Sequence, residues 1–124
     1  MKKIPLSLFV TLLFLLSPWC NAKKTTTQYP VVLVHGLMGF DNMLGIDYFY
    51  NIATILEKDG TLVFTPAVSA INSSEVRGEQ LLTQIESILA LTSAKKVNLI
   101  GHSQGAQTAR YVASIRPDLI ASVT

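Results

Sequence analysis

The stretch that decides the fold of this protein spans residues 96–106 and reads Lys-Val-Asn-Leu-Ile-Gly-His-Ser-Gln-Gly-Ala. Its apolar run from Val97 to Ile100 predicts a buried strand. The strand leads into Gly-x-Ser-x-Gly at 101–105, and residues 106–116 predict a helix. This strand–turn–helix context is what a nucleophile elbow requires, with the serine on a strained turn and its hydroxyl above the sheet.

Within that turn, Ser103 is the candidate nucleophile and His102 its supporting neighbour. Gly101 and Gly105 flank the serine, and we expect that a side chain at either position would collide with the neighbouring strand or helix. The helix that follows directs its amide dipoles at the turn, which favours negative charge there. The alternative is an ordinary strand–helix turn whose serine caps the helix.

The first 22 residues have the order of a secretory signal peptide. Lys2 and Lys3 precede an apolar run at 6–16, and Cys20-Asn21-Ala22 provides a small-residue end suited to cleavage after Ala22. An apolar run of this length falls short of the ~20 residues that span a bilayer. We therefore expect a protein secreted via the periplasm, with no stable membrane span after cleavage. A lipoprotein signal around Cys20 is the alternative, although the bulky Trp19 fits it poorly.

The composition indicates one globular domain. Apolar residues make up 49% of the 124 residues and charged residues 15%. Cleavage after Ala22 removes two of ten basic residues and none of the eight acidic ones, so residues 23–124 carry eight charges of each sign. The neutral balance gives no indication of nucleic-acid binding. Cys20 is the only cysteine, so residues 23–124 have none with which to form a disulfide.

Other segments predict alternating strands and helices. Residues 31–34 are consecutive apolar residues, mostly β-branched, which is typical of a strand covered on both faces. Further strands are predicted at 62–64 and 119–123. Helices are predicted at 48–58, with Asp47 as N-cap and Gly60 as stop, and at about 75–91, with a cap among residues 72–74. This alternation predicts an α/β fold with a mostly parallel sheet flanked by helices.

Two segments meet at the carboxyl edge of the predicted sheet. His35-Gly36-Leu37 follows the strand at 31–34, and Ser103 follows the strand at 97–100. When a serine attacks an ester carbonyl, the resulting oxyanion needs two hydrogen-bond donors. The backbone amides of Gln104 and Leu37 are the candidates, and His35 and Gly36 support the loop. For His35-Gly36 the alternative is an ordinary strand end with a helpful glycine.

Five motifs together resemble secreted bacterial triacylglycerol lipases, above all the subfamily that needs a membrane-anchored foldase. They are Tyr-Pro-Val-Val-Leu-Val-His-Gly-Leu-Met-Gly-Phe-Asp-Asn (29–42), Gly-Ile-Asp-Tyr-Phe-Tyr (45–50), Ser-Glu-Val-Arg-Gly-Glu-Gln-Leu-Leu (74–82), the stretch at 96–105, and Arg-Pro-Asp-Leu-Ile-Ala-Ser (116–122). The resemblance implies an α/β-hydrolase fold, Ser103 as nucleophile, and the Leu37 and Gln104 amides as oxyanion hole.

The same resemblance implies an acylglycerol substrate at an oil–water interface, a foldase partner, and a structural calcium whose ligands lie downstream. We expect no metal site or cofactor within this chain. Many members of the family carry histidine where this chain has Gln104. Because that residue contributes a backbone N–H, we expect the difference to alter fine orientation more than mechanism.

The catalytic partners of the serine are missing. Serine needs a histidine to take its proton and a carboxylate to orient that histidine, in the chain order Ser, acid, His. After Ser103 the only carboxylate is Asp118, and no histidine follows. His102 points away from its neighbour on the elbow, and His35 belongs to the other strand end. We therefore expect residues 23–124 to be the N-terminal part of a single hydrolase domain, incomplete at the C-terminus and inactive and poorly folded alone.

Two further groups receive structural interpretations. For Arg77 we expect a buried pairing with a carboxylate rather than a catalytic role. For the aromatic residues at 48–50 we expect packing in the core rather than an acyl pocket. Two other functions stay open. One is a short-chain esterase or thioesterase of the same fold, against which the motif at 35–41 argues. The other is a non-catalytic truncated product that at most binds a partner such as the foldase.

Overall fold

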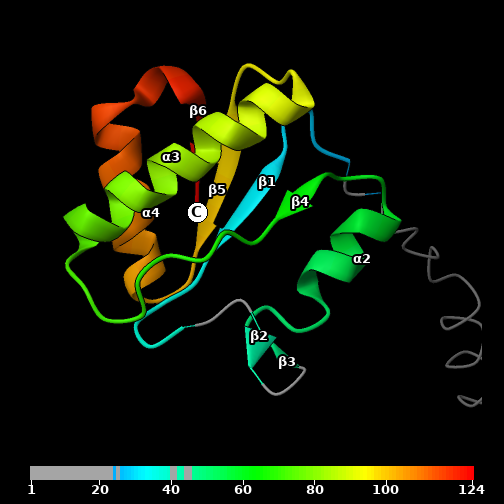
Figure 1. The fold of residues 1–124 in the computed structure, drawn as a ribbon. Coiled ribbons are helices and arrows are strands. Elements are labelled where there is room, and N and C mark those ends of the chain that lie inside the picture. Colours follow the sequence, from blue (N-terminus) through cyan, green and yellow to red (C-terminus); the bar gives the residue numbers. More distant parts are fainter. Residues whose placement is uncertain (1–23, 25, 40–41, 44–45) are drawn as a thin grey trace, which may run out of the picture.

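The computed structural model describes residues 24, 26–39, 42–43 and 46–124 (Figure 1). The predicted signal peptide at 1–22 and its cleavage site lie outside the described residues. Within the described part of the chain, no helix combines the length and apolarity needed to cross a bilayer.

The centre of the fold is a parallel sheet with the strand order β4-β1-β5-β6. Its strands are β1 (Val31–Val34), β4 (Val63–Phe64), β5 (Val97–Gly101) and β6 (Ile120–Val123). β1 pairs along its whole length with β5, from Val31 opposite Asn98 to Val34 opposite Gly101. Because the strands are parallel, the residues that follow β1 and β5 emerge at one edge, as the sequence predicts.

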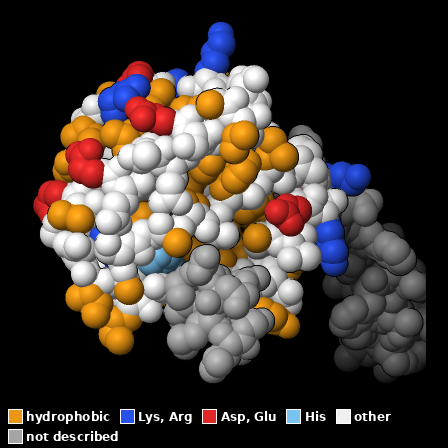
Figure 2. All heavy atoms as spheres, in the orientation of Figure 1, with side chains coloured by type: hydrophobic (Ala, Val, Ile, Leu, Met, Phe, Trp, Pro, Cys, Tyr) orange, Lys and Arg blue, Asp and Glu red, His pale blue; other side chains and the backbone are white. Residues whose placement is uncertain are grey.

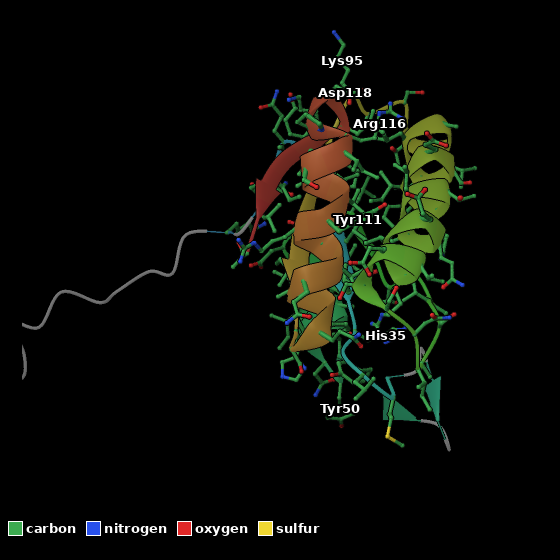
Figure 3. The ribbon with its side chains drawn as sticks, turned by 90° about the vertical axis from the view of Figure 1, so that its left-hand side faces the viewer. His35, Tyr50, Lys95, Tyr111, Arg116 and Asp118 are labelled. Carbon is green, nitrogen blue, oxygen red and sulfur yellow. The ribbon has the colours of Figure 1, made fainter. Side chains whose placement is uncertain are left out.

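Two helices cover one face of this sheet. α3 (Ser74–Thr92) and α4 (Gln104–Ile115) lie side by side over it in both views (Figures 1 and 3). The contact between sheet and helices is the hydrophobic core, whose buried members include Val32, Val34, Leu81, Ile85, Ile88, Val97, Leu99, Ala109 and Val112. The apolar face predicted for the long helix is therefore its buried face. Ser73 caps α3 by accepting the Val76 N–H at 3.3 Å.

The segment between β1 and β4 differs from the prediction. Residues 48–50 form a turn, and the short helix α2 (Ile52–Lys58) begins only after Asn51, which is left-handed with φ 60°. Asp47 is not a helix cap; it ends β3 (Ile46–Asp47), which pairs antiparallel with β2 (Asn42–Met43). The helical spacing of apolar residues was misleading here because no residue of α2 is buried, so tertiary contacts rather than a buried helical face set its start. Tyr50 is 68% exposed, so its predicted core position is wrong.

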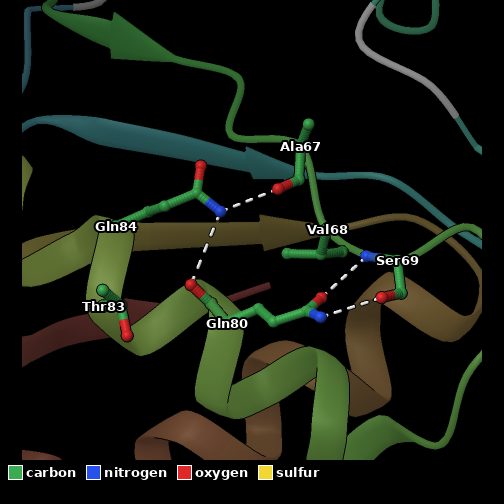
Figure 4. Close-up of a pocket in the computed structure, with 6 residues that line it drawn as sticks. All are labelled: Ala67, Val68, Ser69, Gln80, Thr83 and Gln84. Carbon is green, nitrogen blue, oxygen red and sulfur yellow. Dashed lines mark hydrogen bonds between the residues drawn. The ribbon is translucent and has the colours of Figure 1, made fainter.

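Polar side chains of α3 fix the extended segment that follows β4. Gln84 Nε2 donates to the Ala67 carbonyl at 2.7 Å, and Gln80 Oε1 accepts the Ser69 N–H at 2.8 Å (Figure 4). Hydrophobic side chains gather beside these contacts between α3 and β4, where Phe64, Pro66 and Ile88 line a groove (Figure 2). The segment is thereby held along α3 as it approaches the carboxyl edge of the sheet.

The connection from α4 to the last strand lies at the opposite end of the sheet. α4 is followed by a 3-10 turn, η1 (Pro117–Leu119), before β6 begins. Figure 3 shows Arg116 and Asp118 at this end and His35 and Tyr50 at the other. The separation matters for the site, because Asp118 is the only carboxylate after Ser103.

Candidate active site

Ser103 occupies the two-residue turn between β5 and α4. Its backbone has φ 56° and ψ −125°, a positive-φ conformation outside the left-handed helical region. This conformation is unfavourable for a residue that carries a Cβ. Its hydroxyl makes no capping hydrogen bond to α4, so the interpretation of this serine as an ordinary helix cap is wrong. Ser103 is exposed, and its hydroxyl is not engaged in holding the helix.

The glycines around Ser103 permit very close backbone packing. A Cβ on Gly105 would lie 2.1 Å from the Val34 carbonyl oxygen, and one on Gly101 would lie 2.5 Å from the backbone of Ala106. Both distances are far inside van der Waals contact. These positions therefore let α4 start directly against the end of β1, which brings Ser103 next to the loop that follows β1.

That loop is a tight turn beside the serine. A Cβ on Gly36 would lie 3.0 Å from the Cβ of Ser103, and the Gly39 N–H donates to the Gly36 carbonyl at 3.1 Å. Met38, at φ 53°, donates its N–H to the Ala70 carbonyl at 2.7 Å. Leu37 is 55% exposed, and no described residue accepts its N–H. An amide without an acceptor among the described residues thus lies one residue after Gly36, which packs against Ser103.

Gln104 supplies a second uncommitted amide. It is the first residue of α4, and the first N–H groups of a helix have no partner within it. Within the described residues the next two amides, of Gly105 and Ala106, bond to the carbonyls of His102 and Ser103, whereas no acceptor is found for that of Gln104. Both ends of the side-chain amide are hydrogen-bonded: Oε1 accepts from Arg77 at 2.8 Å and Nε2 donates to the Asn72 carbonyl at 2.9 Å.

Arg77 is buried at the centre of these contacts, and the predicted partner was wrong. Its guanidinium bonds no carboxylate in the described part of the chain; it donates to the carbonyls of His35 and Gly36 and to Gln104. Burial lowers the pKa of Arg77 from its ordinary value, but an arginine side chain stays charged in proteins. A sequence signal for its burial exists, because Arg77 lies one helical turn before Leu81 on the apolar face of α3.

Both histidines have partners other than the serine. The buried His35 ring bonds through Nδ1 to the Gly36 carbonyl at 3.0 Å, and its Nε2 accepts the Val68 N–H at 3.2 Å. Because a backbone N–H can only donate, the hydrogen-bond pattern assigns the proton to Nδ1. His102 Nδ1 lies 2.6 Å from Tyr48 Oη. No hydrogen bond joins either ring to Ser103 within the described residues.

Tyr48 is a site residue that the sequence did not reveal. Its hydroxyl accepts the Gly36 N–H at 3.2 Å in addition to its bond with His102. Its ring lies 5.8 Å from that of His35 and 5.7 Å from that of His102, measured between centroids. The only signal was its place in an aromatic cluster, which is equally typical of a core.

The carboxylate that follows Ser103 is committed at the far end of the sheet. Asp118 pairs with Arg116 through two contacts of 2.9 and 3.0 Å, and Arg116 also reaches Glu86 at 3.0 Å. The hydrogen bond from Arg116 holds the pKa of Asp118 below its ordinary value. Among the described residues, no group of three or more His, Cys, Asp or Glu side chains is arranged to hold a metal ion.

Comparison with known proteins identifies the class. Residues 29–124 match the family described as the alpha/beta hydrolase fold. The match covers more than half of the chain and agrees with the observed topology, so this chain belongs to the α/β-hydrolase family.

Its relatives include three bacterial proteins that are named triacylglycerol lipase. The Vibrio cholerae serotype O1 protein is 66% identical over 100 residues, which are 81% of this chain and 32% of the relative. The Pseudomonas fragi protein is 56% identical over 101 residues (82% and 34%), and the Burkholderia plantarii protein 48% over 114 residues (87% and 32%). The chain therefore spans about a third of the length of these relatives.

Solved structures show the same fold. A Bacillus licheniformis lipase in its propeptide form superposes with a TM-score of 0.62 at 17% identity, over 81% of this chain and 22% of the lipase. An extracellular α/β-hydrolase from a Paenibacillus species gives a TM-score of 0.52 at 26% identity, over 74% of this chain and 37% of that protein. The predicted fold class is confirmed.

Proposed function

We propose that the full-length protein containing this chain is a serine carboxylic-ester hydrolase, a triacylglycerol lipase, with Ser103 as nucleophile. The observation that carries the proposal is the strained turn of Ser103, whose hydroxyl caps nothing and which lies against the loop after β1. Two amides without acceptors among the described residues, those of Leu37 and Gln104, flank it. The names of the relatives supply the substrate class.

The proposed reaction proceeds through an acyl-enzyme. Ser103 Oγ attacks the ester carbonyl carbon, a C–O bond forms, and the carbonyl π electrons move onto the oxygen, where the Leu37 and Gln104 amides stabilise the charge. Collapse of this intermediate expels the alcohol, and water then releases the fatty acid. The serine proton needs a base. Because His35 and His102 are bonded elsewhere, we assign that base and its orienting carboxylate to parts of the protein outside these 124 residues.

The first test compares two serines of the same chain. In the full-length protein, Ser103→Ala should cut ester turnover by several orders of magnitude, as for other triad serines. Ser114→Ala is the matched control, because Ser114 lies at the far end of α4, where its hydroxyl donates to the Tyr111 carbonyl. A fluorophosphonate probe should label the wild type and the control but not Ser103→Ala. Labelling that survived the substitution would place the nucleophile elsewhere.

Substrate length separates the proposal from its alternatives. A lipase should hydrolyse emulsified long-chain triacylglycerols, whereas a short-chain esterase or thioesterase would act only on short or thiol esters. An absence of all Ser103-dependent turnover in correctly folded full-length protein would favour the non-catalytic interpretation.

The proposal extends to export and maturation. The order of charged, apolar and small residues at 1–22 supports export through the periplasm with cleavage after Ala22. N-terminal sequencing of the secreted protein should start at Lys23, and a start at Met1 would contradict this. We also propose dependence on a foldase and a calcium bound outside this sequence. Co-expression with and without the foldase, and chelation of the purified protein, test these two points separately.

A further inference from the structure

We propose that Arg77 and Gln104 form one positioning unit that fixes the directions of the two N–H groups proposed as the oxyanion hole. The inference rests on the proposed function for its catalytic consequence. It concerns side chains that do not touch substrate and act by holding the backbone.

The first arm of the unit holds the peptide between Gly36 and Leu37. The Gly36 carbonyl oxygen accepts from Arg77 Nη1 at 3.1 Å, from the Gly39 N–H at 3.1 Å and from His35 Nδ1 at 3.0 Å. In a planar trans peptide the N–H points opposite to the C=O. Anchoring the Gly36 oxygen inward therefore turns the Leu37 N–H outward, where it has no acceptor among the described residues.

The second arm holds the residue that follows the serine. The same nitrogen, Arg77 Nη1, donates to Gln104 Oε1 at 2.8 Å, while Arg77 Nη2 donates to the His35 carbonyl. The side-chain nitrogen of Gln104, Nε2, donates to the Asn72 carbonyl at 2.9 Å. One guanidinium thus joins the loop after β1 to the start of α4, and those two segments carry the two uncommitted amides.

The cost of burying Arg77 argues against a purely structural role. Desolvating a charge without a carboxylate partner is expensive, and an apolar residue would extend the line of Leu81 and Ile85 at no such cost. Arg77 Nε has no partner among the described residues. The hydrogen bonds that Arg77 does make, through Nη1 and Nη2, all go to the loop after β1 and to the start of α4. Because Arg77 Nη1 bonds the Gly36 oxygen, its positive charge also polarises the Gly36–Leu37 peptide and strengthens the Leu37 N–H as a donor.

Gln104 suits its place because one amide group accepts and donates at once. It accepts from Arg77 on one side and donates to a carbonyl on the other. Methionine has a similar length, but it has no donor, and its thioether sulfur is only a weak acceptor. Gln104→Met therefore removes the second arm while preserving most of the side-chain volume.

The test uses Gln104→Met in the full-length protein, with Gln107→Met as control. Gln107 is exposed one turn along α4, where its side chain accepts only from the Ser74 hydroxyl among the described residues. For Gln104→Met we expect kcat for a soluble ester to fall about 10- to 100-fold with KM changed less than about threefold, as for a small misplacement of catalytic groups. The affinity for a trifluoromethyl ketone, which forms a tetrahedral oxyanion with the serine, should fall in parallel. Arg77→Lys should retain more activity than Arg77→Met.

A second readout does not depend on activity. Amide hydrogen exchange of residues 36–39 should accelerate in Gln104→Met and stay unchanged in Gln107→Met. Unchanged kcat, or a fall that only follows a loss of folded protein, would overturn the catalytic role. Unchanged exchange in the folded variant would overturn the positioning unit itself. If the wild type lacks Ser103-dependent turnover, the proposed function fails, and the exchange result still decides whether Arg77 and Gln104 order the loop.

Discussion

Tyr48 and His102 are joined by a hydrogen bond of 2.6 Å between Tyr48 Oη and His102 Nδ1. The bond links the segment after the β2–β3 hairpin to the residue immediately before Ser103. The same hydroxyl accepts the Gly36 N–H, so a single side chain contacts both backbone segments of the candidate site. The ring of His102 is consequently turned toward Tyr48.

Removal of that hydroxyl should destabilise the fold. Tyr48→Phe keeps the ring but leaves the part-buried Gly36 N–H without its acceptor, so we expect a loss of about 1–3 kcal/mol in the free energy of unfolding. Urea denaturation of the full-length protein measures it. Tyr50→Phe, the same change at an exposed ring two residues away, should have little effect. Equal stabilities for the two variants would show that the Tyr48 hydroxyl contributes nothing.

The folded protein should be more stable with glycine at position 103 than with alanine. At φ 56° a Cβ is strained, and glycine alone removes that strain. We expect Ser103→Gly to exceed Ser103→Ala by about 1 kcal/mol in the free energy of unfolding, while both lack ester turnover. The comparison separates backbone strain from loss of the hydroxyl, because both variants lack it. Equal or reversed stabilities would mean that no strain is stored at this residue.

Truncation of Leu81 tests the core between α3 and the sheet. Leu81 is completely buried, so Leu81→Ala should cost about 2–5 kcal/mol. Leu91→Ala removes the same atoms from the same helix at a position that is 81% exposed, and should change stability by less than about 0.5 kcal/mol. Thermal and urea unfolding of both variants give the comparison. A small effect at Leu81 would contradict the packing of α3 described above.

The Asp118–Arg116 pair should give a small, pH-dependent stabilisation. The folded protein lowers the pKa of Asp118, so this contribution is complete above the ordinary aspartate pKa and is lost as the pH falls through the lowered one. Asp118→Asn should therefore be slightly less stable than the wild type at neutral pH, and the gap should close in acid. The effect is small because the pair is exposed. A gap that widened on acidification would contradict the sign of the shift.

Local sequence determined most of the elements. The apolar runs at 31–34 and 97–100 are strands, and the stripe of apolar residues on the long helix is its buried face, because period and side-chain type act over a few residues. The glycines at 101 and 105 indicated close packing before any neighbour was known, since an added Cβ needs space whatever the partner. The order of strands and helices then determined that the ends of β1 and β5 share one edge.

Only the tertiary structure determined which side chains contact one another in the candidate site. The hydrogen-bond partners of Arg77 lie 27 to 42 residues away along the chain. His102, a partner of Tyr48, lies 54 residues away from it. No local sequence pattern could identify partners at such separations. Residues 48–51 had the spacing of a helix but formed a turn, because Tyr48 is bonded to the loop after β1 and to His102. Side-chain type established that Arg77 would need polar partners. Only the approach of β1, α3 and α4 determined that its partners among the described residues are two backbone carbonyls and the side-chain amide of Gln104, with no carboxylate.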